Sequence, residues 1–342
     1  MTKQDQQAIF ERSIDPQLLE SLRNTPNILN DNPSLLEIQS RLNQSFEEDS
    51  SNPFAAHVSM ADWIVPATET TEAVSIRCYT PKITPQHKPL PVLLWIHGGG
   101  FIAGNVPSDD PICQRFAVQC NCAVISVEYR LAPQNPFPAG FNDCYAALQW
   151  LAGDGALKLN INIDNLAVGG GSAGGCLAAG IVLKACETGG PKIKHQLLMV
   201  PVLDDRHQTP SSKDIIDYRV TWNRELSLLA WNGYLKNISE EESRYFAPAR
   251  VKVIPNLPST FISVEEQDLL RDEGIIYAQR LMQSGVTTEL HVYPGTFHGS
   301  FLIESDADVS RQHLADAVNS LRRSLHKNDD LTDDTFQLAS ND

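Results

Sequence analysis

The sequence predicts an α/β fold, with a mostly parallel sheet of eight strands flanked by helices. From Pro91 onward, short apolar runs alternate with longer segments of helical periodicity. The runs are continuously apolar, as expected for strands that are buried on both faces. A glycine-rich turn at 169–175 joins one of these runs directly to a helical segment. Together these observations predict a sheet that is covered by helices on both sides.

Residues 1–50 are polar, and their apolar residues recur at helical spacing. Pro26 and Pro33 interrupt the pattern, so we expect two or three short amphipathic helices. Such helices cannot bury their apolar stripes alone, so they must lie on another part of the chain.

The strands of the sheet follow. Two alternating runs, Val58–Val65 and Ala73–Tyr79, are separated by turn residues and predict an antiparallel pair. Six further strands are expected at Val92–Ile96, Ala123–Glu128, Leu166–Val168, Gln196–Val200, Thr260–Val264 and Glu289–Tyr293. Helices are expected around Pro111–Gln119, Phe141–Leu151, Ala173–Cys186, Asp272–Gln283 and Val309–Leu325.

The connection between Val200 and Thr260 is far longer than a sheet crossover needs. Its aromatic-rich segment Thr221–Leu235 predicts a helix. Ligands bind at the carboxyl edge of open α/β sheets, so an insertion there predicts a lid, with a purely structural excursion as the alternative. The acidic tail 328–342 has no periodicity and is predicted to be disordered.

The turn within Leu166–Leu177 carries the first candidate for chemistry. Residues 170–174 fit the pattern G-x-S-x-G, in which a sharp strand-to-helix turn exposes the hydroxyl of the central Ser172. Glycines flank the serine because side chains would collide across so sharp a turn. The same stretch also fits the dinucleotide pattern G-x-G-x-x-G. However, the acidic residue expected about 20 positions later is missing from Pro191–His195.

A serine nucleophile needs a base, a group that orients the base, and N–H donors for the oxyanion. The segment HGGGF at 97–101 follows a buried strand, and its glycines leave backbone N–H groups unshielded. We assign Gly99 and Gly100, together with the N–H of Ala173, to the oxyanion hole. His97 is expected to brace this loop.

The candidate base is His298, which lies in the loop YPGTFHGSF after the last strand. His291, His313 and His326 lie within a strand or on the last helix, which indicates ordinary surface or core roles.

The candidate orienting acid is Asp268, in the loop SVEEQDLLRDEG after the strand Thr260–Val264. Other acidic residues near the strand ends are Asp204, Asp205, Glu265, Glu266, Asp272 and Glu273. The first two are rivals for the role, the next two are expected in solvent, and the last two suit the first turn of a helix. The chain order Ser172, Asp268, His298 is the order expected of an α/β-hydrolase triad.

Six motifs carry a resemblance to a known family. They are HGGGF (97–101), VEYRLAPQNPFPA (127–139), DCYAALQWL (143–151), GGSAGG (170–175), DLLRDEG (268–274) and FHGSF (297–301). From about Pro91 to the last helix, the chain resembles the hormone-sensitive-lipase-like family of α/β-hydrolases, which includes microbial carboxylesterases. It departs from the family pattern at Gly171, Gln134, Leu269 and Ser300.

The resemblance implies an α/β-hydrolase fold with the triad and oxyanion hole named above, and no cofactor. Cys120 and Cys122 lack histidines at ligand spacing, so no metal site is expected. It also implies a helical cap built from the N-terminal segment 1–50 and the insertion 201–255. The hydrolase core is then expected at 51–200 and 256–327.

The expected function is that of a serine carboxylesterase, which hydrolyses short- to medium-chain acyl esters through an acyl-enzyme. Phe101, Trp222, Leu226 and Trp231 are candidates for lining an apolar substrate pocket, with cap packing as the alternative. Two other functions stay open: a non-catalytic small-molecule receptor on the same fold, and an amidase or deacetylase.

Composition limits the partners. The formal charge, 27 − 42 = −15, disfavours nucleic acid because the protein's field repels polyanions. The chain has neither an apolar signal segment nor a long apolar stretch, so integral membrane association is not expected. Its seven cysteines are odd in number and lack paired C-x-x-C spacing, which indicates reduced thiols in a cytoplasmic protein. The expected partner is a small-molecule ester, and a homodimer is compatible with the sequence.

Overall fold

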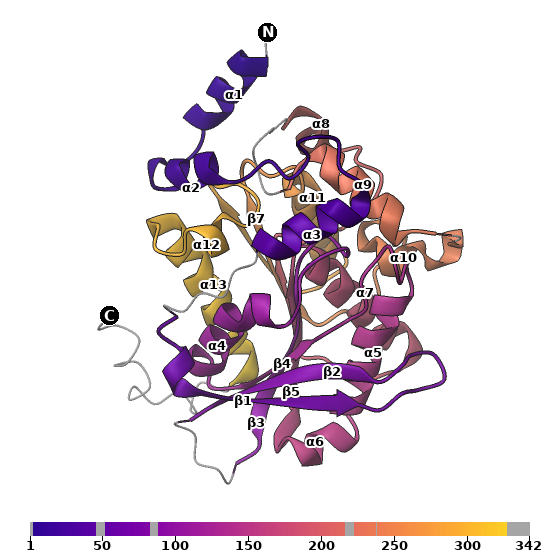
Figure 1. Ribbon diagram of the computed structural model, residues 1–342. Coiled ribbons are helices and arrows are strands. Elements are labelled where there is room, and N and C mark those ends of the chain that lie inside the picture. Colours follow the sequence, from indigo (N-terminus) through magenta and orange to yellow (C-terminus); the bar gives the residue numbers. More distant parts are fainter. Residues whose placement is uncertain (1–2, 46–51, 83–87, 216–221, 237, 327–342) are drawn as a thin grey trace.

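The computed structural model describes residues 3–45, 52–82, 88–215, 222–236 and 238–326 (Figure 1). Its sheet has the spatial order β1-β2-β4-β3-β5-β6-β7-β8. The strands are β1 (Val58–Val65), β2 (Val74–Pro81), β3 (Leu90–Ile96), β4 (Ala123–Val127), β5 (Ile161–Gly171), β6 (His195–Met199), β7 (Ser259–Glu265) and β8 (Thr288–Tyr293). The pairs β1–β2 and β2–β4 are antiparallel, and the other pairs are parallel. The predicted eight-stranded, mostly parallel sheet is therefore confirmed.

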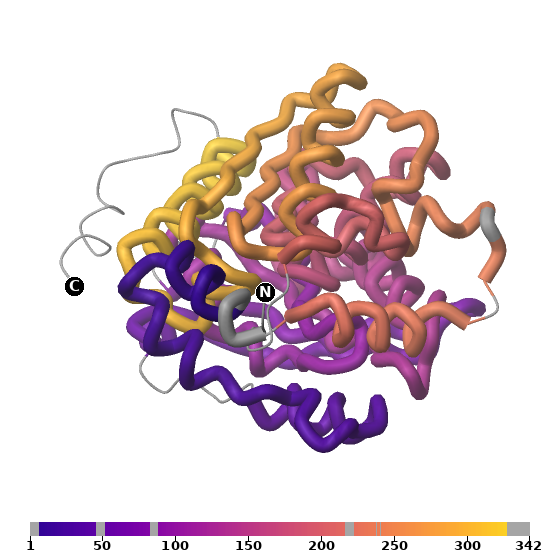
Figure 2. The backbone as a smooth tube through the Cα atoms, turned by 90° about the horizontal axis from the view of Figure 1, so that it is seen from above, coloured from indigo at the N-terminus to yellow at the C-terminus, as the bar shows by residue number. Residues whose placement is uncertain are grey.

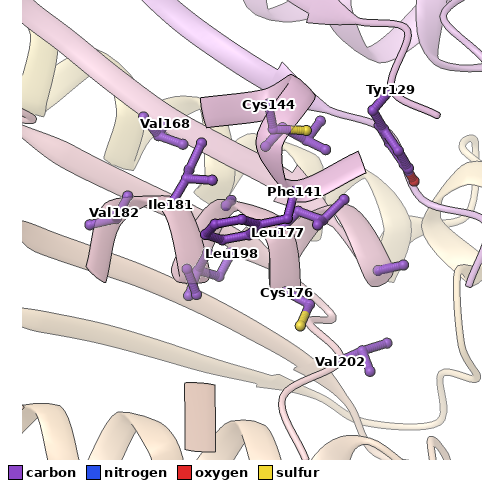
Figure 3. Close-up of a cluster of buried hydrophobic side chains, with 14 of the residues drawn as sticks. Tyr129, Phe141, Cys144, Val168, Cys176, Leu177, Ile181, Val182, Leu198 and Val202 are labelled. Carbon is purple, nitrogen blue, oxygen red and sulfur yellow. The ribbon is translucent and has the colours of Figure 1, made fainter. Parts of the chain in front are cut away.

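Alternate residues of the central strands enter two separate cores. On β3, Val92, Leu94 and Ile96 face one core, whereas Leu93 and Trp95 face the other. The first core is covered by α5 (Ala139–Leu151), α7 (Ala173–Thr188) and α11 (Arg271–Gln283), and the second by α4 (Asp110–Gln119) and α13 (Asp308–Leu325). Figure 3 shows apolar side chains of α5 and α7 meeting the sheet in the first core. Because both faces are buried there, the central strands β3 and β4 are almost entirely apolar.

Two local features differ from the expectation. The predicted strand Leu166–Val168 is the inner part of the longer strand β5, whose first residues include Asn162 and Asp164. These polar residues are not fully buried, so no apolar run marks the start of the strand. Four short helices were also not predicted, because one turn is too short for a periodic pattern. They are α6 (Asp154–Lys158), α8 (Pro210–Asp214), α10 (Ser243–Phe246) and α12 (Ser300–Ile303).

The N-terminal segment and the long insertion lie against each other. The N-terminal helices are α1 (Lys3–Arg12), α2 (Leu19–Asn24) and α3 (Leu35–Ser45), and the predicted aromatic-rich helix of the insertion is α9 (Arg224–Tyr234). Helix α3 contacts α9, and Figure 2 shows the two segments side by side from above. Phe10, Ile14, Leu18 and Leu22 bury their side chains with Phe297, the residue before His298.

Some sequence expectations concern other parts of the chain. All seven cysteines are free thiols, and among them only Cys186, near the end of α7, is exposed. Within the described ranges, no helix is long and apolar enough to cross a bilayer. The acidic tail 328–342 and Thr221 lie outside the described residues.

Candidate active site

Ser172 lies in the sharp turn between β5 and α7. Its φ of 53° and ψ of −117° form a strained combination for a residue with a side chain. A Cβ atom at Gly170 would collide with the backbone of Gly174, and one at Gly174 would collide with the end of β3. The Ser172 N–H donates to the Met199 carbonyl at 2.8 Å, and the Ser172 carbonyl accepts from the Val202 N–H at 3.1 Å. Glycine neighbours and the segment after β6 thus hold the serine in its strained geometry.

The loops after β7 and β8 bring an acid and a histidine to this serine. Ser172 Oγ is 2.9 Å from His298 Nε2, and His298 Nδ1 is 2.6 Å from Asp268 Oδ2. The other oxygen of Asp268 accepts from the Leu270 N–H at 3.0 Å, which fixes the carboxylate. All three side chains of this chain of hydrogen bonds are buried. When the neutral imidazole carries its proton on Nδ1, the lone pair of Nε2 can accept the serine proton.

The surroundings of His298 act on its basicity in opposite directions. Burial, the largest single effect, lowers the pKa of His298 because it disfavours the charged imidazolium. The charge and hydrogen bond of Asp268, together with the charge of Glu265, outweigh burial, and the net pKa is raised. The imidazole is therefore well suited to accept and hold a proton.

The glycine-rich loop after β3 lies beside the serine. Gly99 has φ 108° and Gly100 has φ 62°, which side chains rarely allow. The Gly99 carbonyl accepts from the N–H groups of Ile102 and Ala103, and this pairing curls the loop. Ala173 is the first residue of α7, and the first N–H groups of a helix have no partner within the helix. Gly99, Gly100 and the first residue of α7 are thus the residues from which donors for an oxyanion are expected.

His97 packs within this loop. Its ring stacks on Tyr129 at a centroid distance of 4.2 Å, and its Nδ1 donates to the Gly98 carbonyl at 2.8 Å. The Tyr129 hydroxyl donates to the His97 carbonyl at 3.1 Å. Burial lowers the pKa of His97 to about 4, so the ring is neutral at physiological pH. These contacts fit the bracing role expected of His97; Tyr129 was not singled out from the sequence.

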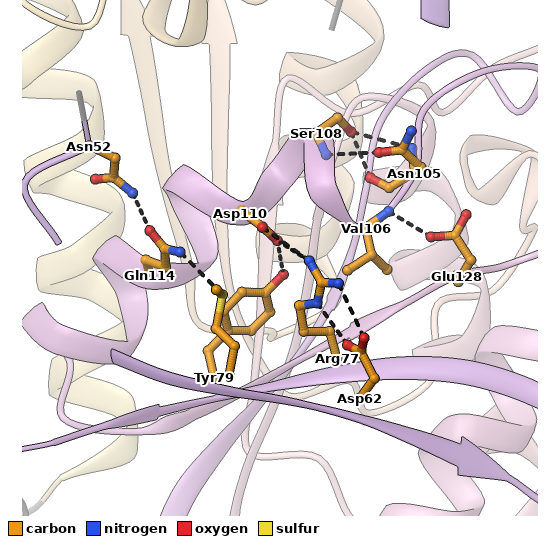
Figure 4. A network of polar contacts seen from close by, with 11 residues as sticks. Asn52, Asp62, Arg77, Tyr79, Asn105, Val106, Ser108, Asp110, Gln114 and Glu128 are labelled. Carbon is orange, nitrogen blue, oxygen red and sulfur yellow. Dashed lines mark hydrogen bonds and ion pairs between the residues drawn. The ribbon is translucent and has the colours of Figure 1, made fainter. Parts of the chain in front are cut away.

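The far side of the loop is held by three polar side chains. Asn43 Oδ1 accepts from the Gly104 N–H at 2.9 Å, and Gln39 Nε2 donates to the Ile102 carbonyl at 2.6 Å. Glu128 accepts from the Val106 N–H at 2.8 Å, as Figure 4 shows beside the Arg77–Asp110 ion pair. Gln39 and Asn43 belong to α3, so the N-terminal segment contacts the loop directly.

The four candidate pocket residues differ in position. Trp222 covers Gly100 so closely that a Cβ there would collide with the indole ring, and its ring centroid lies 6.3 Å from that of His298. Phe101 stacks on Tyr234 at 4.1 Å and lies tilted against Trp231 at 5.0 Å. Leu226 is fully buried in the same core. The structure therefore brings Trp222 to the triad and places the other three in an apolar cluster.

The rival acids have other partners. Asp204 pairs with Arg206 at 2.6 Å, and Asp205 pairs with Arg250 at 3.3 Å. Glu273 lies in the first turn of α11, where its carboxylate accepts from the Leu203 N–H at 2.6 Å.

The expectation that Glu265 and Glu266 lie in solvent was wrong. Glu265 is completely buried, and its oxygens accept from the Gly299 N–H and the Ser300 hydroxyl, both at 2.6 Å. Glu266 is half-buried and accepts from the Gly295 N–H at 2.8 Å. A carboxylate tolerates burial when such donors replace water. In the sequence, this burial is indicated only by the position of Glu265 directly after the predicted apolar strand Thr260–Val264.

The rival histidines are also engaged elsewhere. His291 lies 2.9 Å from Glu289, and His313 Nε2 lies 2.7 Å from the Ser263 hydroxyl. His326 Nε2 lies 2.7 Å from the Cys120 carbonyl.

Glu265, Asp268 and His298 form a compact cluster, because one donor atom from each lies within 4.8 Å of the others. Such a set of groups can hold a cation. Here hydrogen bonds link Asp268 to His298 and Glu265 to the two residues after His298. These bonds account for the cluster without a further ligand.

The chain is similar to known proteins over most of its length. A family model described as alpha/beta hydrolase fold matches residues 93–302. Esterase LipI of Mycobacterium tuberculosis is 32% identical over 301 residues, which cover 87% of this chain and 91% of that protein. The ethyl acetate hydrolase of Pseudomonas putida is 32% identical over 289 residues, covering 81% and 88%. The solved structure of a bacterial heroin esterase has a TM-score of 0.84 and 41% identity, covering 92% of this chain and 99% of that one.

Proposed function

Because this chain belongs to the hormone-sensitive-lipase-like family of α/β-hydrolases and is a carboxylic ester hydrolase, we propose that it acts by acyl transfer through Ser172. The observation that carries the proposal is the buried chain of hydrogen bonds from Ser172 through His298 to Asp268. It lies beside the glycine-rich loop and the first N–H of α7. This esterase activity disfavours the receptor alternative, since a receptor has no need of a nucleophile.

The proposed reaction has two steps. Ser172 Oγ forms a bond to the ester carbonyl carbon while His298 Nε2 accepts the hydroxyl proton. The N–H groups of Gly99, Gly100 and Ala173 bind the oxyanion, and Asp268 stabilises the imidazolium. The carbon–oxygen bond to the alcohol then breaks, and His298 gives the alcohol its proton. Water, activated by His298, attacks the acyl-serine and releases the acid.

The experiment that tests this proposal is hydrolysis of p-nitrophenyl esters together with labelling by a fluorophosphonate. Ser172→Ala should lower kcat on the order of 10⁶-fold and abolish labelling, because the nucleophile is gone. Ser227→Ala is a matched control, since Ser227 also bonds a buried histidine, His207, at 2.8 Å. It should keep activity within about threefold, as expected for a substitution outside the reacting groups. Labelling that survives Ser172→Ala would disprove the assignment.

We propose that the substrates are short- to medium-chain acyl esters, and that they bind in an apolar pocket bounded by Trp222. In support, the indole ring covers Gly100 and lies close to His298, so it limits the space beside the oxyanion donors. An ethyl acetate hydrolase among the relatives is in keeping with a small acyl group.

Removing the indole ring should admit longer acyl chains. We expect Trp222→Ala to raise kcat/KM for octanoyl relative to acetyl esters by about tenfold, because each buried methylene is worth about 1 kcal/mol. Leu228→Ala, on the exposed face of α9, should leave the ratio unchanged. An equal ratio in Trp222→Ala and wild type would contradict the proposed position of the indole in the pocket. Measuring p-nitroanilides alongside the esters tests the amidase alternative.

A further inference from the structure

Glu265 is a buried carboxylate that the acyl-transfer mechanism does not use. It is the last residue of β7, where it pairs with Tyr293, the last residue of β8. Its Oε2 accepts from the Gly299 N–H and its Oε1 accepts from the Ser300 hydroxyl, each at 2.6 Å. These donors belong to the two residues that directly follow His298. Both are short hydrogen bonds.

The backbone at this point needs support. Gly299 has φ 77°, and the chain turns there into the short helix α12. The Ser300 N–H donates to the Phe297 carbonyl at 2.9 Å, so the residues on both sides of His298 are tied together. Asp268 holds the imidazole at Nδ1, and Glu265 holds the chain immediately after it. Two acidic side chains, one at the end of β7 and one in the loop that follows it, thus hold His298 and the residues after it.

We propose that Glu265 is a positioning residue for His298, which acts by clamping Gly299 and Ser300 so that the imidazole keeps its place between Ser172 and Asp268. This inference rests on the proposed role of His298 as the general base. Misplacement of a reacting group by about 1 Å can cost about 100-fold in rate, so a clamp of this kind affects kcat more than substrate binding.

The charge of Glu265 acts on the same histidine. Two titratable groups face the carboxylate: His298 from the loop after β8 and Asp268 from the loop after β7. Burial, opposed by the attraction of His298, raises the pKa of Glu265 to about 8, and the Asp268 charge adds to the rise. In return, the carboxylate contributes to raising the pKa of His298. Below pH 8 Glu265 is therefore largely protonated, and near neutral pH it acts on the histidine loop through its hydrogen bonds rather than through its charge.

The test compares Glu265→Ala with Glu265→Gln in the full chain. Alanine removes the clamp, and we expect kcat to fall about 30- to 100-fold with KM within about threefold. Glutamine can accept from the Gly299 N–H and donate to the Ser300 hydroxyl, so it should restore kcat to within about fivefold of wild type. Because a pKa of about 8 leaves Glu265 largely neutral over the acid limb of the kcat/KM profile, glutamine should leave that limb unchanged.

Two further variants complete the design. Ser300→Ala removes one donor and should lower kcat by about three- to tenfold, which keeps the test open if Glu265→Ala does not fold. Glu266→Gln is the matched control, because Glu266 bonds Gly295 and should leave both kcat and the acid limb unchanged. The inference is overturned if Glu265→Ala keeps kcat within twofold of wild type. It is also overturned if glutamine is as damaging as alanine, because glutamine keeps the hydrogen bonds of the proposed clamp. A wild-type protein that neither cleaves esters nor reacts with a fluorophosphonate would overturn the proposed function instead.

Discussion

At the scale of single residues, the glycines around Ser172 are not equivalent. A Cβ atom at Gly171 would meet only the Trp95 ring, at an ordinary contact distance of 3.9 Å. A Cβ atom at Gly170 or Gly174 would collide with backbone atoms. The elbow therefore requires glycine on its inner side, whereas the position directly before the nucleophile has room for a side chain.

We expect Gly171→Ala to keep the fold and raise the free energy of unfolding by about 0.4–1 kcal/mol, because alanine restricts the unfolded chain. Gly170→Ala should instead lower the free energy of unfolding, by several times the size of that gain, because backbone atoms must move to make room for the methyl group. Urea denaturation measures both changes, and esterase activity checks that Ser172 keeps its geometry. Loss of activity in Gly171→Ala would show that this site has no spare room. Gly171→Asp then tests the acidic residue that the family often has there.

Some residues of the site were predictable and others were not. Ser172, Asp268 and His298 each stand in a local motif at a strand end, so each could be predicted separately as a candidate. The role of Glu265 depends on Ser300, in a loop that folds back beside it, and no local pattern links the two. A buried carboxylate and an exposed one look alike in sequence, because only tertiary contacts supply the donors.

At the scale of elements, helix α3 is coupled to the glycine-rich loop after β3. Gln39 and Asn43 lie one helical turn apart and bond Ile102 and Gly104, on the far side of the glycines. The N-terminal segment thus supports the site from outside the sheet, and the same segment packs against Phe297 beside the histidine loop.

Truncating this contact should affect the chemistry through the loop. We expect Gln39→Ala and Asn43→Ala each to lower kcat/KM by about three- to tenfold, because a lost hydrogen bond to the loop costs about 1 kcal/mol. Gln44→Ala, on the exposed side of the same helix, serves as the control. The measurement is steady-state hydrolysis of a p-nitrophenyl ester. Wild-type kinetics in the Gln39→Ala/Asn43→Ala double variant would contradict the coupling.

The order of strands and helices followed from apolar runs, because two-sided burial leaves a strong local signal. The full length of β5 did not, since Asn162 and Asp164 lie beyond the buried part of the strand. The contact of α3 with α9 joins segments far apart in the chain, so periodicity predicted the helices but not their partners.

At the scale of the whole molecule, buried groups give stability two opposing dependences on pH. Burial lowers the pKa of His97 and His195 to about 4 and that of His313 to about 3, from 6.5. Between those values the unfolded chain binds more protons, so stability is lost as pH falls. Burial raises the pKa of Glu265 to about 8 and that of Glu273 well above 4.5. Between pH 4.5 and these raised pKa values the folded state binds more protons than the unfolded chain, so stability is lost as pH rises.

We therefore expect the free energy of unfolding to be highest near pH 6, where the two sets of groups balance. Above pH 6.5 the raised carboxylates and His298, whose pKa is also raised, act in the same direction, and stability should fall by about 1–3 kcal/mol per pH unit. The net charge of −15 adds to this loss. Urea denaturation at pH 5, 6, 7 and 8 measures the profile, and Glu265→Gln should flatten its alkaline side. A steady gain in stability from pH 6 to 8 would contradict the expectation.

Helix α7 connects Ser172, at its N-cap, to an exposed cysteine near its other end that a thiol-reactive label can modify. Cys186 lies in its last turns, and a rise of 1.5 Å per residue puts it about 20 Å from Ser172. The other six thiols are buried, so a maleimide dye reacts at Cys186 alone. Paired with a fluorescent phosphonate on Ser172, that dye forms a donor–acceptor pair of known separation. The helix thus provides an internal molecular ruler, whose fixed separation calibrates fluorescence distances measured in the phosphonate-inactivated protein.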